Sequence, residues 1–250
     1  RAPRHIGMNS LFSGPEYKSL LQDLLGKGYR AVGFEQANAA RADLILRHDV
    51  DLCLERAVEM GRIEAELGLN AIYFVLLTSP LYNALSKAGM DCLAALQEQG
   101  HEIGLHFDAS IHDAADLDQA AGRECDLLAS ALGREVTMVS FHRPAKRYLG
   151  DPGLIGGRAH AYQPRFFSEM GYCSDSRGGW HHGHPLDHEA VLQGKALQLL
   201  THPIWWIGPP MAPEARLMGY LEDRVAGLDA DLAANSSTHI PGRLRIGGGE

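Results

Sequence analysis

The sequence predicts an α/β protein built around a mostly parallel sheet. Short apolar runs alternate with segments of helical periodicity about six times, which is the pattern of repeated strand–helix units. The connections between these segments have ordinary lengths. No Gly-rich loop of the G-x-G-x-x-G or P-loop type follows a predicted strand, so an open dinucleotide-binding sheet is not indicated. The strands are therefore expected either to form another doubly wound sheet or to close into a barrel.

The predicted strands are short and rich in β-branched and aromatic residues. They cover 44–46, 71–77, 102–105, 136–141, 172–173 and 197–200. The predicted helices have apolar residues on one face, and several end at a glycine. They cover 17–25, 52–67, 88–99, 116–132 and 213–234, with Pro213 in a first turn, where a missing N–H costs nothing. Residues 34–42 and 148–163 are predicted to be connections.

The composition is that of an ordinary globular protein, with 250 residues, 45% hydrophobic and 22% charged. No shift in composition divides the chain, so one domain over 1–250 is expected, with its core at about 44–234. The Gly- and Ser-rich segment 235–250 is expected to be a loosely held tail.

Charge and hydropathy exclude two classes of partner. The net charge of -8 argues against nucleic acid, which calls for a basic face. No apolar run approaches about 18 residues, so no membrane span is expected. The first residues lack a secretory pattern, and Met8 resembles a natural start. The 4 cysteines are far apart, which fits a reducing compartment. A cytoplasmic enzyme or binding domain is therefore expected.

Ionisable side chains recur where the predicted strands end. Taken alone, the segment 47–51 is equally compatible with a polar turn before a helix N-cap. The recurrence favours a site, because the carboxyl ends of parallel strands meet at one rim. Imidazole and carboxylate together are ligands of a divalent transition metal, and thiolate is absent. The residues are His48, Asp49, Asp51, His106, Asp108, His142, Arg143, Asp175, Arg177 and His202.

Five short motifs at these positions resemble, in order, those of the NodB-homology polysaccharide deacetylases, carbohydrate esterase family 4. The resemblance covers about residues 44–206. It implies a deformed (β/α) barrel of about seven strands with its site on the C-terminal rim. The His-Asp-Val-Asp form further resembles a subgroup that includes deformylases of lipid-linked amino sugars. The motifs are Arg47-His48-Asp49-Val50-Asp51, His101-Glu102-Ile103-Gly104-Leu105-His106, Phe141-His142-Arg143-Pro144, Asp175-Ser176-Arg177-Gly178-Gly179-Trp180 and Leu200-Thr201-His202-Pro203.

Two departures from the family's pattern leave the ligand assignment open. The family's adjacent Asp pair is separated here, so either Asp49 or Asp51 could hold the metal. The position of the second His in the family's second motif is Ser110. Its nearest replacements are His112, which lies on a polar loop, and His142, which leaves a strand end at the rim. We favour His142.

The resemblance implies a role for each remaining residue. Asp51, His106 and His142 would hold a divalent metal, of which zinc is the expected one. Asp49 would be the general base, and His202 the general acid that protonates the leaving amine. The supporting roles are Asp175 fixing the tautomer of His202, Arg143 keeping Asp49 charged, and Trp180 forming an apolar wall for the substrate.

The function implied is metal-dependent hydrolysis of the N-acetyl or N-formyl amide of an amino sugar or lipid-linked saccharide, in surface-polysaccharide biosynthesis. Two alternatives remain, a small cyclic-amide hydrolase similar to allantoinase and a catalytically silent barrel that binds glycan. Metal content separates the silent barrel from both enzymes. The His-rich segment 181–188 is expected to be mostly solvated, and His101 to lie on the opposite rim.

Overall fold

The structure is a computed structural model that describes residues 12–144 and 146–242. It divides into two compact units, one of residues 12–209 and another whose described part is 210–242. The proposed start at Met8 and the last part of the predicted tail, 243–250, lie outside the described residues. The second unit contains one helix, α8 (Pro213–Asn235), which agrees with the helix predicted at 213–234.

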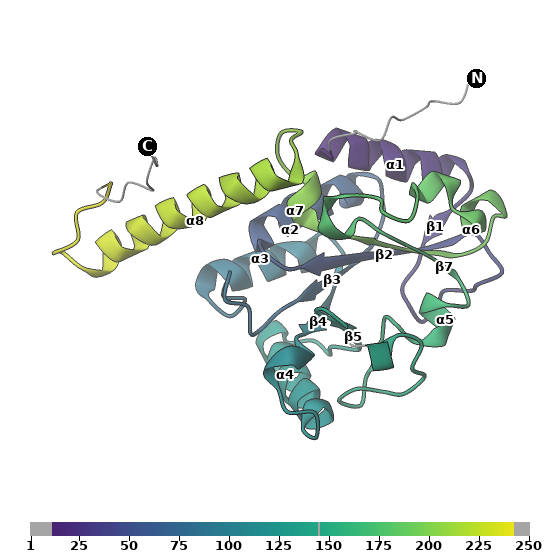
Figure 1. Cartoon of the computed structure of the whole chain (residues 1–250), viewed down its shortest axis with the longest axis horizontal. Helices are drawn as coiled ribbons and strands as arrows, with labels where there is room; N and C mark the ends of the chain where they lie inside the picture. Colours follow the sequence, from purple (N-terminus) through teal and green to yellow (C-terminus); the bar gives the residue numbers. More distant parts are fainter. Residues whose placement is uncertain (1–11, 145, 243–250) are drawn as a thin grey trace. The chain divides into compact units, whose positions relative to one another are not determined.

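The larger unit is built on a parallel sheet that curls into a half-barrel (Figure 1). Its path follows the order β6-β5-β4-β3-β2-β8-β7, and β1 pairs with β2 beside this path. Every strand pair is parallel. The prediction of a deformed (β/α) barrel of about seven strands is confirmed. The strands are β1 (Arg30–Ala31), β2 (Asp43–Val50), β3 (Ile72–Val75), β4 (Glu102–Phe107), β5 (Met138–Phe141), β6 (Ala159–His160), β7 (Gly171–Ser174) and β8 (Leu197–Thr201).

Helices connect most of these strands, and their ends follow the expected local chemistry. The side chains of Ser13 and Ser86 accept backbone N–H bonds at the starts of α1 and α3. Gly133, with φ of 64°, ends α4 in the left-handed conformation. The helices of this unit are α1 (Gly14–Gly26), α2 (Leu54–Glu66), α3 (Lys87–Glu98), α4 (Leu117–Leu132), α5 (Pro164–Phe167), α6 (Glu189–Leu192) and α7 (Pro203–Trp206).

Strand β2 extends further than the sequence predicts. Hydropathy ends the strand at residue 46, yet all eight residues of Asp43–Val50 are buried strand. Three ionisable residues, Arg47, His48 and Asp49, therefore lie inside the sheet. The strand continues because each of them has a buried partner, which a single-sequence pattern does not reveal. The two-residue strands β1 and β6 were not predicted, since they are too short to show a period.

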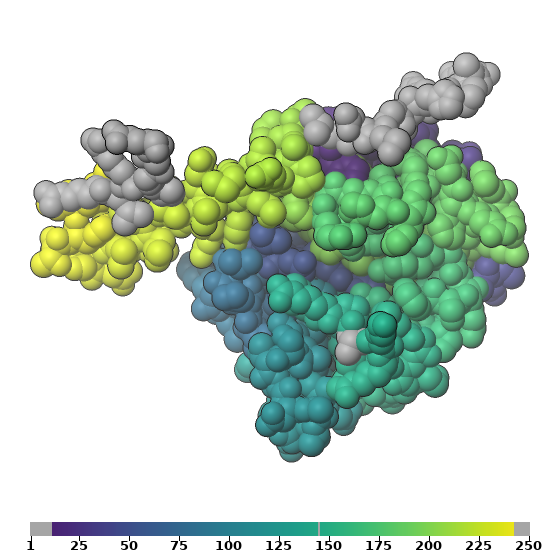
Figure 2. All heavy atoms as spheres, in the orientation of Figure 1, coloured from purple at the N-terminus to yellow at the C-terminus, as the bar shows by residue number. Residues whose placement is uncertain are grey.

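The connection after β5 is long but fastened to α4. The N–H of Gly156 donates to Asp118 Oδ1 at 2.7 Å, and Arg158 forms an ion pair with Asp126 at 2.5 Å. In Figure 2 the atoms of this connection lie beside those of α4, in neighbouring teal and green. These two contacts attach residues 156–158 to α4.

No helix within 12–144 or 146–242 combines the length and hydropathy needed to cross a membrane.

The core of the half-barrel contains an apolar cluster that includes Phe34, Phe74 and Phe166. Phe34 meets both other rings edge-on, at centroid distances of 6.2 and 4.7 Å. This apolar cluster packs directly against the charged residues of β2, because the Arg47 guanidinium lies over the Phe74 ring.

Gly104 of β4 marks the closest approach in this core. A Cβ atom there would lie 2.5 Å from two ring carbons of Phe74 and 3.0 Å from the carbonyl oxygen of Met138. We expect Gly104→Ala to lower the free energy of unfolding by about 1–3 kcal/mol through overpacking, measured by urea denaturation. The matched control is Gly26→Ala, whose Cβ meets nothing within 4 Å and which should change stability by less than about 0.5 kcal/mol. Equal effects of the two variants would contradict this view of the core.

Candidate metal centre and active site

Three side chains from neighbouring strands converge at the carboxyl rim. Asp51 follows β2, His106 lies in β4, and His142 follows β5. Their possible ligand atoms, one from each residue, lie within 4.8 Å of one another. Asp51 Oδ1 is 3.1 Å from His106 Nε2 and 3.4 Å from His142 Nδ1. The sequence predicts this same set, and the distance between Asp51 and His106 is short enough for one ion to bridge them.

The fit of these residues to a metal ion rests on Asp51 Oδ1. This oxygen is buried without a hydrogen-bond partner in the described part of the chain, although two imidazole nitrogens approach it. Burial acts to raise the pKa of Asp51, but His106 and His142 lower it well below its ordinary value. A charged, orphaned oxygen between two imidazoles is the donor arrangement of a divalent transition-metal site.

Ser140 supports the same interpretation. His106 Nδ1 lies 2.5 Å from Ser140 Oγ, and the residues are register partners on β4 and β5. The serine hydroxyl oxygen can accept a hydrogen bond from Nδ1–H, which leaves Nε2 free as a ligand. Such an outer hydrogen bond is the usual way in which a ligating imidazole is oriented.

Asp49 is held by Arg47, two residues earlier on the same face of β2. The Arg47 guanidinium donates to both carboxylate oxygens, from Nε at 3.0 Å and from Nη2 at 2.8 Å. Tyr162 and Gln198 accept further bonds from it, and the guanidinium lies over the Tyr162 ring. Burial acts to raise the pKa of Asp49, but the charge of Arg47 brings it below the ordinary value.

This arrangement replaces the one predicted for Arg143. The sequence gives Arg143 the task of keeping Asp49 charged, whereas the structure gives that contact to Arg47. Arg143 is exposed, with its backbone at a φ of 54°. Arg47 was missed because a buried arginine inside an apolar strand is rare. Its spacing of two residues from Asp49, which places both side chains on one face of a strand, was the available signal.

His202, which directly follows β8, forms a pair with the buried Asp175, which directly follows β7. His202 Nδ1 lies 2.6 Å from Asp175 Oδ1, and the His202 backbone N–H donates to Asp175 Oδ2 at 3.0 Å. Trp206, for which the sequence predicts no role in the site, donates its indole N–H to the same Oδ2 at 2.6 Å. Burial acts to lower the pKa of His202, but Asp175 raises it to about 9. The contact predicted for Asp175 is present.

The pair and the three candidate ligands belong to one cluster. His202 Nε2 lies 3.9 Å from Asp51 Oδ2, and His106 Nε2 lies 3.9 Å from Asp49 Oδ2. A protonated imidazole and a charged carboxylate therefore flank the same candidate metal position. This arrangement brings together a base that can activate a water and an acid that can protonate a leaving group.

Trp180 lies near this cluster in an aromatic group. Its ring meets Phe12 edge-on at 5.6 Å and lies 5.9 Å from Trp206, the partner of Asp175. Trp180 is partly exposed. A partly exposed ring in contact with the residue that holds Asp175 is compatible with the predicted role of Trp180 as an apolar wall, which stays a prediction.

Other candidate histidines lie elsewhere. His112 stacks on Phe107, and its Nε2 lies 3.0 Å from Glu124 Oε1, so it is outside the cluster. His181, His182, His184 and His188 form no group that could hold a metal among the described residues. His184 and His188 instead accept backbone N–H bonds from Leu186 and Ala190, residues of short helical turns.

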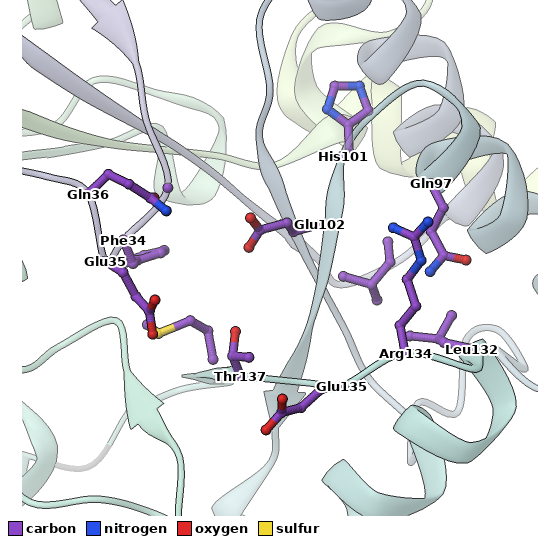
Figure 3. Close-up of a pocket in the computed structure, with 13 residues that line it drawn as sticks. Phe34, Glu35, Gln36, Gln97, His101, Glu102, Leu132, Arg134, Glu135 and Thr137 are labelled. Atoms are coloured by element: carbon purple, nitrogen blue, oxygen red, sulfur yellow. The ribbon is translucent and has the colours of Figure 1, made fainter.

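His101 lies at the opposite end of the sheet, as predicted. It lines a cavity of about 280 Å³ formed around the amino ends of β4 and β5. Figure 3 shows this cavity with Glu35, Glu102, Glu135 and Arg134 around it. Because the strands are parallel, this cavity and the candidate metal centre lie at opposite ends of β4.

No protein-family model matches the sequence, and no curated protein matches it. The chain is similar in fold to family 4 carbohydrate esterases. One from Bacillus anthracis shares 19% identity, with 90% of this chain and 94% of that chain covered and a TM-score of 0.45. A Streptococcus pyogenes deacetylase solved with acetate shares 14%, with 87% and 92% covered and a TM-score of 0.46. A pseudoenzyme of the same family from Bacillus anthracis shares 12%, with 78% and 63% covered and a TM-score of 0.40.

The choice between His142 and His112 can be tested directly. We expect His142→Ala to weaken Co²⁺ binding by at least about 10- to 100-fold, the loss typical of disturbing a metal site's hydrogen-bonded surroundings. His112→Ala should bind Co²⁺ like the native chain, because its ring contacts Glu124 instead. Absorption titration with Co²⁺ measures both variants. Loss of binding in His112→Ala alone would assign the third ligand to His112.

Proposed function

We propose that this protein is a metal-dependent hydrolase that removes an acetyl or formyl group from the nitrogen of an amino sugar. The observation that carries the proposal is the orphaned Asp51 Oδ1 between His106 and His142, with His202 3.9 Å from Asp51 and Asp49 3.9 Å from His106. A metal position flanked by a separate acid and base is what amide hydrolysis requires, because the amine is a poor leaving group until it is protonated.

Asp51, His106 and His142 would hold the metal, and their mixed carboxylate–imidazole set suits zinc. When bound, such an ion supplies Lewis-acid polarisation of the substrate carbonyl. Two nitrogen ligands and one oxygen ligand leave positions open for substrate and water.

Asp49 accepts the proton of the attacking water. Its carboxylate is kept ionised by Arg47, and its Oδ2 lies 3.9 Å from Nε2 of the candidate ligand His106. His202 donates its Nε2 proton to the departing nitrogen as the C–N bond breaks. Its Nδ1–H is fixed on Asp175, so Nε2 is the nitrogen directed at the cluster. The products are the carboxylic acid of the acyl group and the free amine.

Trp180 supplies an apolar wall beside the acyl group or the sugar ring. We further propose a cytoplasmic role in surface-polysaccharide biosynthesis, with an N-acylated precursor or lipid-linked saccharide as substrate. The motif resemblance to deformylases of lipid-linked amino sugars supports this setting. Activity on N-formyl and N-acetyl amino sugars, compared in one assay, tests the acyl preference.

The roles of Asp49 and His202 are tested by paired substitutions. Asp49→Asn and His202→Ala should each retain metal while turnover falls by about 10² to 10⁴, the usual contribution of one general catalyst. His202→Ala should be partly spared on an amide with a good leaving amine, because the acid acts only on the departing nitrogen. Steady-state kinetics on one ordinary and one activated amide, with metal analysis, measures this.

Three results would change the assignment. Loss of metal in Asp49→Asn would exchange the roles of Asp49 and Asp51. Unchanged turnover in both variants would refute the catalytic assignment. A native protein that binds metal and glycan without turnover would be a silent barrel, and this outcome would overturn the proposed function.

The pH dependence follows from the raised pKa of His202. Its protonated form is the active acid, so kcat/KM should fall at alkaline pH, where His202 loses its proton. Asp175→Asn removes the charge that raises this pKa, so the alkaline decline should move to lower pH. Kinetics between pH 5 and 10 at saturating metal measures the shift. An alkaline limb that stays in place in Asp175→Asn would contradict His202 as the acid.

A further inference from the structure

A row of buried polar side chains lies directly behind the candidate site. His48 of β2 is the register partner of Thr201 in β8 and of Tyr73 in β3. Because successive side chains along a strand point to opposite faces, this row lies on the face opposite to Asp49. The residue after Thr201 is His202. The row therefore adjoins both the proposed base and the proposed acid in the chain.

Glu64 of α2 gathers this row into one network. His48 Nε2 lies 2.7 Å from Glu64 Oε1, and His48 Nδ1 lies 2.8 Å from Thr201 Oγ1. The Tyr73 hydroxyl donates to Glu64 Oε2 at 2.6 Å, and the Tyr17 hydroxyl of α1 donates to Oε1 at 2.5 Å. We call these five residues the Glu64 network; each has a relative exposure of 0%.

The network is charged and takes no direct part in the proposed chemistry. Burial acts to raise the pKa of Glu64, but His48 brings it below the ordinary value, so the carboxylate is ionised. His101 also faces it, with Nδ1 3.8 Å from Oε2. A buried carboxylate with three close donors fixes the groups that donate to it, since leaving any of them unsatisfied is costly.

Two of the three branches of the network lead to strands of the sheet, and the third, through Tyr17, leads to α1. The branch through His48 to Thr201 joins β2, which carries Asp49, to β8, which leads into His202. The branch to Tyr73 leads to β3, which supplies none of the proposed site residues. The three candidate ligands come from β2, β4 and β5, so the β2–β8 connection does not pass between them.

We propose that His48 and Thr201 are positioning residues: the hydrogen-bond chain from Glu64 through His48 to Thr201 holds the carboxyl end of β8 against β2 and so places His202 relative to Asp49 and Asp51. The inference rests on the proposed function. We expect the effect of this positioning on the rate to be large, because a misplacement of about 1 Å in an active site can cost about 10²-fold in rate.

Three substitutions separate positioning from simple stabilisation. Thr201→Val removes the hydroxyl that His48 contacts with little change in shape, and Thr201→Ser retains it. Tyr73→Phe is the matched control, because it also removes one buried hydroxyl from the network but on the branch to β3. We expect Thr201→Val to lower kcat by at least about 10-fold, with KM and Co²⁺ affinity within about 2-fold of native. Thr201→Ser should restore kcat.

Tyr73→Phe should lower the urea midpoint about as much as Thr201→Val does, yet leave kcat within about 2-fold. Equal losses of kcat in Thr201→Val and Tyr73→Phe would show a structural role only and overturn the inference. The same conclusion would follow from an unchanged kcat in Thr201→Val.

A second measurement keeps this inference distinct from the proposed function. In the metal-free full chain, the pKa of His202 can be followed by NMR, with the resonance assigned from His202→Gln. Thr201→Val should lower this pKa by at least about 0.5, because His202 moves relative to the carboxylates around it, and Tyr73→Phe should leave it unchanged. A native chain without turnover would refute the proposed function, while this titration would still decide the inference. An unchanged His202 pKa in Thr201→Val would then overturn it.

Discussion

Strand β2 buries four ionisable side chains in eight residues, and the site depends on how each is compensated. Asp43, Arg47, His48 and Asp49 are all at most 3% exposed. An isolated buried charge is unstable by several kcal/mol, whereas a paired and hydrogen-bonded one persists. Removing one partner of a buried ion pair typically costs about 3–5 kcal/mol. The pairing of β2 with its surroundings therefore ties the fold and the site together.

The alternation of β2 separates these charges onto two faces. Arg47 and Asp49 point into the half-barrel, where Tyr162 and Gln198 complete the bonding of the guanidinium. His48 points toward the helices and meets Glu64. The charge of the inner face is directed at chemistry, because Asp49 borders the candidate metal position. On the outer face, the contact between His48 and Glu64 links the sheet to α2, and we propose that this link positions the residues of the inner face.

The parallel topology and most of the site could be predicted from sequence because both leave local signals. Apolar runs mark strands, and the residues just after them mark the rim, so Asp51, His142 and His202 stood out. The roles of Arg47 and Glu64 could not be predicted, because they depend on partners distant in sequence: Gln198 for Arg47, and Tyr17 for Glu64. For the same reason hydropathy predicts that this strand ends just before Arg47, whereas β2 continues to Val50. Hydropathy registers a charge as exposed unless its partner is known.

The environments of Asp49 and His202 also explain why one is suited to accept a proton and the other to donate one. Asp49 shares β2 with a guanidinium that favours its ionised form, and its pKa is lowered. His202 is paired with Asp175, which favours the imidazolium and raises its pKa to about 9. At a pH above the lowered pKa of Asp49 and below the raised pKa of His202, Asp49 is ionised and His202 is protonated, as acid–base catalysis needs. Two titratable groups whose surroundings drive their pKa values apart define an acid and a base. The assignment thus depends on the partners Arg47 and Asp175 as much as on the catalytic side chains themselves.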